Sequence, residues 1–406
     1  MVEKFYTNYL MKTLLLARPD HSTFLYEELK KNPEIEISYH TFSAFKKKSL
    51  LNYWKPSVKS VDKEVDISYS FSFFHKFLYF LSKQIVFDYY KTESQFSTYF
   101  FKNMIQKFTD EVNIVHYWPI YYHQFVRNFQ HNNPKIKFIA DVYAAHPDHA
   151  RANLESAFDE FGLSIEKSHF VKSRDTDLAS LENVENMLVP SEYVAESYRI
   201  YYPKTKIYIA NFGLFNNPPK IVKQLKRGNL SPLKLIFVGK VSIEKGCPYL
   251  FEAMRKLPNT EFHLDVIGEI ETNQINIFRP YLNLPNIRIL GKLPNFKILE
   301  ILPEYHVFVL PSLSDAYSLA VSEALAHKLP VIITENVGNK YDVRKFQTGE
   351  VCQIKSVDVL IKSILNLQNE EYRQYLRTNI DDFIADNQEN SYPSKVLEIY
   401  NQLLQK

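Results

Sequence analysis

The feature that most constrains the fold is a repeated alternation of short apolar runs with segments of helical length. In the first half of the chain the runs are KTLLLA, EIEISYHTF, VNIVHYW, IKFIADVY, NMLVPS and KIYIAN. After residues 213–232, which are rich in Asn, Pro and Lys, the alternation starts again with LKLIFVGK, EFHLDVIGE, NIRILGK, HVFVLPS and LPVIIT. Strands that alternate with helices are typical of parallel sheets. The sequence therefore predicts two doubly wound α/β domains.

Length supports a division of the chain, because 406 residues exceed the size at which a single core stops growing. We expect one domain at residues 1–212 and a second at 213–390. At 391–406 an amphipathic helix should follow, with Ser394 as its N-cap and with one apolar face that packs back on the first domain. That face consists of Val396, Ile399, Tyr400 and Leu403.

Composition excludes several classes of protein. A formal net charge of +3 gives no reason to expect a nucleic-acid partner. Cys247 and Cys352 fit no metal-ligand spacing. No apolar run is long enough for a signal peptide or a membrane span, so we expect a cytoplasmic protein. Residues 69–101 are dense in aromatic side chains and favour a buried helix pair, or alternatively a surface that meets the inner face of a membrane.

Candidate ligand-binding residues follow the strands of the second domain. The strand in LKLIFVGK ends at Gly239 and Lys240, and Lys245 and Gly246 come just before the next helix. In an open parallel sheet, ligands bind at the carboxyl ends of strands, where such loops lead into helices. Glycines let a ligand approach the backbone, and two lysines can hold a diphosphate by charge.

Two carboxylates lie eight residues apart in LPSLSDAYSLAVSEALAHKLPVII. Asp315 should lie in the loop after a buried strand, and the next helix should begin near Tyr317 or Ser318. The backbone N–H groups at the start of that helix favour a phosphate. Glu323 follows about one and a half turns into the helix and can lean toward the same ligand. Its apolar neighbours argue against a fully exposed helix face.

Together these motifs resemble the donor-binding domain of retaining, nucleotide-sugar-dependent glycosyltransferases of the GT-B fold, family four. The resemblance rests on FVGKVSIEKG, on the two acids with the small-residue helix after them, and on the final PVI. MLVPSEYVAESY and KIYIANFG are similar to the region where that family crosses between domains. The likeness covers residues 185–405. It implies two Rossmann-like domains that face each other across a cleft, with the C-terminal helix crossing back to the first domain.

The resemblance also implies roles for individual residues. Asp315 would contact the transferred sugar near the reacting carbon, and Glu323 would accept hydrogen bonds from the ribose hydroxyls. The donor diphosphate would be held without a metal or another cofactor. Its contacts would come from the side chains of Lys240 and Lys245, from the backbone at Gly239 and Gly246, and from the N–H groups of Ala316, Tyr317, Ser318 and Leu319.

The sequence departs from the family pattern in three places. Asp315 stands where the family usually has Glu, and Ala316 and Ser318 replace the usual glycines. The loop after the first strand has no glycine pair, and Ser22 or Thr23 at a helix N-cap could take over its role.

In the first domain, His146 is the best match to a family histidine that contacts the donor sugar. Asp141, at the end of its strand, is the second candidate, and a structural role is open for both. The RDTD segment at 174–177 contains the Asp-x-Asp of metal-dependent glycosyltransferases, but no apolar strand precedes it. HPDH at 146–149 has metal-type ligands, but nothing nearby completes a metal site of three or four ligands.

The expected function is retaining transfer of a sugar from a nucleotide-diphosphate sugar to a hydroxyl of a glycan or lipid-linked acceptor, as in polysaccharide biosynthesis. The alternatives are a catalytically silent GT-B scaffold that binds a partner, and another GT-B enzyme such as a sugar-nucleotide epimerase.

Overall fold

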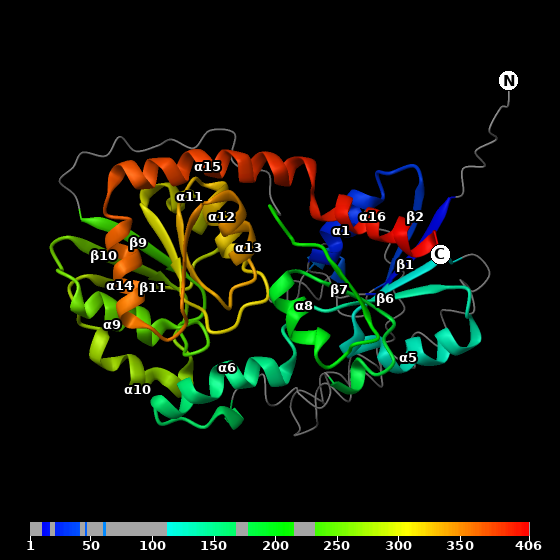
Figure 1. Ribbon diagram of the computed structural model, residues 1–406, viewed down its shortest axis with the longest axis horizontal. Helices are drawn as coiled ribbons and strands as arrows, with labels where there is room; N and C mark the ends of the chain where they lie inside the picture. Colours follow the sequence, from blue (N-terminus) through cyan, green and yellow to red (C-terminus); the bar gives the residue numbers. More distant parts are fainter. Residues whose placement is uncertain are drawn as a thin grey trace.

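The computed structural model consists of two α/β domains that lie side by side and are joined along one edge by the last two helices (Figure 1). It describes residues 10–16, 21–40, 45–46, 60–61, 112–167, 178–214 and 232–405. The aromatic segment at 69–101, the RDTD segment and most of the predicted interdomain connection lie outside these residues. The interpretations given for them stay predictions.

The first domain contains a parallel sheet of six described strands in the order β2-β1-β5-β6-β7-β8. All six strands predicted for this half are confirmed. Its elements are β1 (Met11–Leu16), α1 (His21–Leu29), β2 (Ile35–His40), β5 (Ile114–Tyr117), α5 (Pro119–Asn132), β6 (Lys137–Asp141), α6 (Pro147–Glu160), β7 (Asn186–Val189), α8 (Glu192–Arg199) and β8 (Lys206–Ile209), with a separate short pair β3 (Phe45–Lys46) and β4 (Ser60–Val61).

The second domain has a parallel sheet in the order β11-β10-β9-β12-β13-β14, which is the doubly wound Rossmann order. The five predicted strands are confirmed and β14 is added. Its elements are β9 (Leu233–Val238), α9 (Cys247–Lys256), β10 (Phe262–Ile267), α10 (Ile275–Phe278), β11 (Ile287–Gly291), α11 (Asn295–Ile301), β12 (Val307–Leu310), α12 (Leu319–Ala326), β13 (Val331–Thr334), α13 (Lys340–Phe346), β14 (Gly349–Cys352), α14 (Val357–Asn366) and α15 (Glu370–Glu389).

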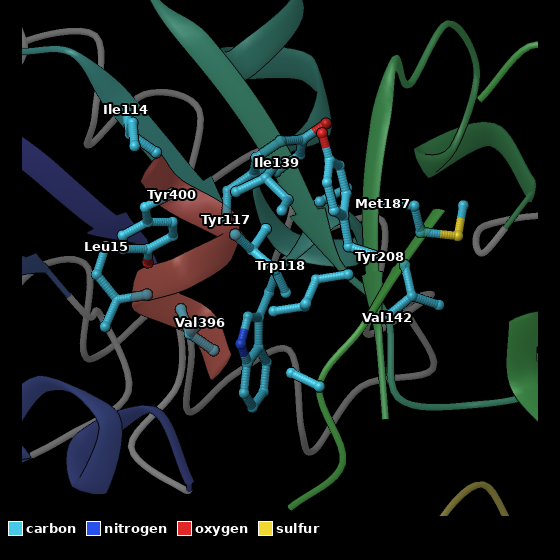
Figure 2. Packing of buried hydrophobic residues seen from close by; sticks show 14 of the residues in the cluster. Leu15, Ile114, Tyr117, Trp118, Ile139, Val142, Met187, Tyr208, Val396 and Tyr400 are labelled. Carbon is cyan, nitrogen blue, oxygen red and sulfur yellow. The ribbon is translucent and has the colours of Figure 1, made fainter. Parts of the chain in front are cut away.

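The last helix, α16 (Tyr392–Leu404), leaves the second domain and packs on the first, as predicted (Figure 1). Val396 and Tyr400 point into the core beside Leu15 and Ile114 (Figure 2). Burial of each such side chain contributes about 1.5–3 kcal/mol, so the helix is a large part of the first-domain core. Its N-cap is Ser391, not Ser394, and the Ser391 hydroxyl accepts a hydrogen bond from the Ser394 N–H at 3.4 Å.

Helix α6 makes a second junction between the domains. Leu154 and Phe158 of this helix are buried in one apolar cluster with Ile243 and Leu313 of the second domain. At the end of the helix, Glu160 accepts a hydrogen bond from the Tyr249 hydroxyl at 2.7 Å. The strand-end loops of the second domain therefore lie against the first domain.

Candidate active site

The loops after β9 and β12 meet where the strand order of the second sheet reverses. These two strands are neighbours in the sheet, but their helices follow in opposite directions along it. The Leu313 N–H donates a hydrogen bond to the Glu244 carbonyl at 2.8 Å, which joins the loops directly. Gly246 ends the first loop with φ 69°, and a Cβ there would lie 1.8 Å from the Pro311 carbonyl oxygen. Only glycine permits this approach.

Residues 311–318, called the acid loop below, are also fixed by the loop after β13. The Asp315 backbone N–H donates a hydrogen bond to the Asn336 carbonyl, and the Asp315 backbone carbonyl accepts one from the Gly338 N–H, both at 2.9 Å. The Asn339 side chain accepts from the Ser318 N–H at 2.7 Å. This bond corrects one expectation, because the Ser318 N–H is already used and is not free for a phosphate. Helix α12 begins at Leu319 with Ser318 as its N-cap, as the sequence predicts.

The two predicted cations form ion pairs with nearby acids. Lys245 Nζ lies 2.6 Å from Asp315 Oδ2, and the Asp315 side chain is only 11% exposed. Lys240 is exposed and pairs with Glu271, in the segment that follows β10. Gly239, which directly follows β9 and precedes Lys240, has φ 155°. To bind these lysines, a diphosphate would therefore have to replace the two carboxylates as their partner.

Glu323 is half-buried on α12, so it is not a fully solvent-exposed helix residue. Its Oε1 accepts a hydrogen bond from Asn295 Nδ2, at the start of α11, at 2.9 Å. Burial raises the pKa of Glu323, while the Asn295 hydrogen bond and the nearby His327 oppose that rise. The sequence carried no signal that Asn295 would hold this carboxylate.

The described contacts of His146 and Asp141 lie away from the acid loop, and their contact with a sugar stays a prediction. The His146 ring is 2% exposed, stacks on Tyr201 with centroids 3.7 Å apart, and caps α6 by accepting from the Asp148 N–H.

Asp141 belongs to a buried polar chain that ends on α16. Its Oδ2 lies 2.9 Å from His116 Nε2, and His116 Nδ1 lies 2.6 Å from the Tyr400 hydroxyl. Strand β6 is buried along most of its length, so its sequence does not reveal which side chains point toward a ligand. Ser22 is likewise not an N-cap, because it lies inside α1 with its hydroxyl 3.0 Å from that of Tyr39. Thr23 also lies inside α1.

Two polar side chains at the start of α8, in the first domain, bond to the acid loop. Ser191 Oγ donates a hydrogen bond to the Ala316 carbonyl at 2.6 Å and accepts one from the Val194 N–H. The Tyr193 hydroxyl lies 3.0 Å from Ser314 Oγ. Sequence reasoning missed both, although the position of PSEY after the strand in NMLVPS was a usable signal.

A family comparison identifies the second half of the chain. Residues 222–382 match the family described as glycosyl transferases group 1. Over these residues the chain is similar to that family. The matched residues include Lys245, Asp315 and Glu323. A search of curated protein sequences finds no significant match.

Comparison with solved structures shows the fold of the whole chain. A sucrose-phosphate synthase from Thermosynechococcus elongatus is 15% identical with a TM-score of 0.66, over 97% of this chain and 99% of that one. An E. coli trehalose-6-phosphate protein bound with UDP-2-fluoro glucose is 12% identical with a TM-score of 0.65, over 97% and 99%. A lipopolysaccharide outer core galactosyltransferase is 14% identical with a TM-score of 0.61, over 97% and 100%. The glycosyltransferase has the two-domain GT-B fold.

The described residues show neither a membrane-spanning helix nor a metal-binding cluster. None of the described helices is long and apolar enough to cross a membrane. No group of three or more His, Cys, Asp or Glu side chains in the same part of the chain is arranged to hold a metal ion.

Proposed function

We propose that this glycosyltransferase transfers a sugar from a nucleotide-diphosphate sugar to a hydroxyl group of a glycan or lipid-linked acceptor, with retention of configuration. The observation that carries the proposal is the convergence of Lys245, Asp315 and the start of α12 at the point where the strand order reverses. A cation and a helix N-terminus favour a diphosphate, and a carboxylate beside them can hold sugar hydroxyls.

In the proposed reaction, Lys245 leaves Asp315 for the donor diphosphate, and Lys240 adds a second positive charge. The bond between the anomeric carbon and the diphosphate oxygen breaks as the acceptor oxygen bonds to the same face of that carbon. The acceptor proton passes to the leaving phosphate. Lysines and backbone N–H groups neutralise the charge that develops on this phosphate, so the proposal needs no metal. Asp315 holds the sugar while the two domains position the acceptor.

The donor base and the acceptor are proposed from similarity alone. The E. coli protein bound with UDP-2-fluoro glucose makes UDP-glucose the first donor to test. The likeness to a lipopolysaccharide galactosyltransferase favours a glycan or lipid-linked acceptor. Peripheral membrane contact through residues 69–101 belongs to the same proposal, and liposome flotation at low salt without binding would remove it.

Two alanine variants separate the proposed roles of the acids. Glu323→Ala should weaken nucleoside-diphosphate binding about tenfold or more, because a carboxylate that binds ribose hydroxyls is lost. Asp315→Ala should lower turnover about 100-fold, with nucleotide affinity changed less than about twofold, because its contact is with the reacting sugar. Calorimetry with UDP and release of UDP from UDP-glucose measure the two effects.

Glu300→Ala, which removes an exposed carboxylate from α11, is the matched control and should behave as the wild type. Unchanged binding and turnover in both site variants would overturn the assignment. A wild-type protein that neither binds nor cleaves any nucleotide sugar would indicate a silent scaffold.

A further inference from the structure

Tyr317 of the acid loop lies where the chain crosses between the domains in both directions. Its ring is buried in the first-domain core, although its loop belongs to the second domain. It contacts Phe212 of the outgoing connection edge to face, with centroids 5.9 Å apart. Phe212 in turn contacts Tyr392, at the start of the returning helix α16, at 5.2 Å. The outgoing and returning segments thus meet beside this one side chain.

The Tyr317 hydroxyl is part of a polar chain that reaches both crossings. It donates a hydrogen bond to Asp342 Oδ2, on α13, at 2.9 Å. Asn211, just after β8, donates to both oxygens of Asp342 at 3.3 Å. Lys395 of α16 donates to Asn211 Oδ1 at 2.5 Å. The carboxylate of Asp342 therefore joins the acid loop to the ends of both interdomain connections.

Ser314 and Ala316, on either side of Asp315, are held by side chains of the first domain. Ser314 is bonded to Tyr193, and the Ala316 carbonyl is bonded to Ser191. Tyr317 is held through Asp342. The Asp315 carboxylate pairs with Lys245, and the residues on either side of it are bonded to the first domain, so its orientation is sensitive to how the acid loop is seated there.

We propose that Tyr317 and Asp342 are positioning residues that set the orientation of Asp315 through the acid loop. This inference rests on the proposed function, because its consequence for turnover requires Asp315 to hold the donor sugar. The hydrogen bond between the two side chains lies within the second domain, and Asn211 of the outgoing connection bonds to the same carboxylate, so the pair links the acid loop to the interdomain connection. Loss of this bond should loosen the loop while the phosphate and ribose contacts of the second domain stay in place.

Tyr317→Phe is the first test, because it keeps the ring against Phe212 and removes only the hydroxyl. Tyr305→Phe is the matched control: Tyr305 is as buried, and its hydroxyl donates to a carboxylate, Asp265, at 2.6 Å, away from the acid loop. Both variants lose one buried tyrosine–carboxylate bond and should lose similar stability. Only Tyr317→Phe should change the orientation of the Asp315 carboxylate.

The first measurement is hydrogen exchange of peptides that cover residues 311–318, without ligand. Tyr317→Phe should speed exchange there about tenfold, and Tyr305→Phe should leave it unchanged. The second is UDP release from UDP-glucose. Tyr317→Phe should lower turnover at saturating donor about tenfold with KM changed less than about twofold, whereas Tyr305→Phe should match the wild type.

A double-mutant cycle of Tyr317 and Asp342 separates loss of their hydrogen bond from a general loss of stability. Asp342→Ala leaves the Tyr317 hydroxyl without this acceptor and should lower turnover at least as much as Tyr317→Phe, and the double variant should be no slower than Asp342→Ala alone, because that variant already lacks the bond. Additive losses, or equal effects of Tyr317→Phe and Tyr305→Phe, would overturn this inference alone. A wild-type protein that releases no nucleotide from any of a panel of UDP-, GDP- and ADP-sugars would overturn the proposed function, and the inference with it.

Discussion

Glu323 shows at the scale of one residue how a site can be prepared at a cost in stability. The carboxylate is half-buried, with one hydrogen bond from Asn295. Burial raises its pKa above the usual 4.5, so the folded protein holds the charged form less readily than the unfolded chain does. The cost is fully present at pH values above the raised pKa and disappears below 4.5. A ligand with two hydroxyl groups would offset it.

Glu323→Gln should therefore stabilise the free protein at pH 7 by about 0.5 kcal/mol while it weakens nucleotide binding. Glutamine keeps the oxygen that accepts from Asn295 but has no charge to bury. Urea unfolding at pH 7 and at pH 4 measures the effect, which should vanish at the lower pH. The exposed Glu300→Gln should show no gain at either pH. A loss of stability in Glu323→Gln at pH 7 would contradict this account of the carboxylate.

At the scale of elements, the site depends on loops that approach one another more closely than side chains normally allow. Gly246 brings the start of α9 against the backbone of the acid loop, and Gly338 does the same for the loop after β13. At Gly338 an added Cβ would lie 1.8 Å from the Ala316 carbonyl oxygen and 2.6 Å from Ser191 Oγ. Three strand ends and the start of α8 are thus packed into one rigid support for Asp315.

Gly246→Ala tests this packing against a glycine with the same backbone conformation. Gly291 has φ 68°, close to the 69° of Gly246, but nothing lies within 4 Å of its added Cβ. Gly291→Ala should cost about 1 kcal/mol from backbone strain alone. Gly246→Ala should cost about 3 kcal/mol or more, since the Pro311 carbonyl must also move. Equal losses in urea unfolding would mean that the loops are not in contact.

For the whole molecule, the strands and the crossover helix could be predicted because their signals are local. Strands buried on both faces give continuous apolar runs, and α16 has a clear helical period. Strand β14 was missed because Gly349–Cys352 is a half-exposed edge strand with a glycine and a glutamate. The N-cap of α16 was misplaced because Ser391 and Ser394 both suit that position.

The interdomain contacts could not be predicted, because no local pattern links residues far apart in the chain. Ser191 and Ala316 are 125 positions apart, and Asp342 and Asn211 are 131 apart. His146 and Asp141 were chosen for their place after a strand, but the direction of their side chains is set by tertiary packing. Family resemblance drew attention to Asp315 and Glu323, whereas the side chains that hold the acid loop emerged only from the structure.

The central claim is that the second domain binds a nucleotide-diphosphate sugar at the acid loop and Glu323. The most direct test is the thermal unfolding midpoint of the wild type and Glu323→Ala with a panel of nucleoside diphosphates and their sugars. At 100 times the Kd, the right ligand stabilises the fold by about 2.7 kcal/mol, so the wild-type midpoint should rise by several degrees. Glu323→Ala should lose most of that rise. No rise with any member of the panel, or an equal rise in the variant, would contradict the claim.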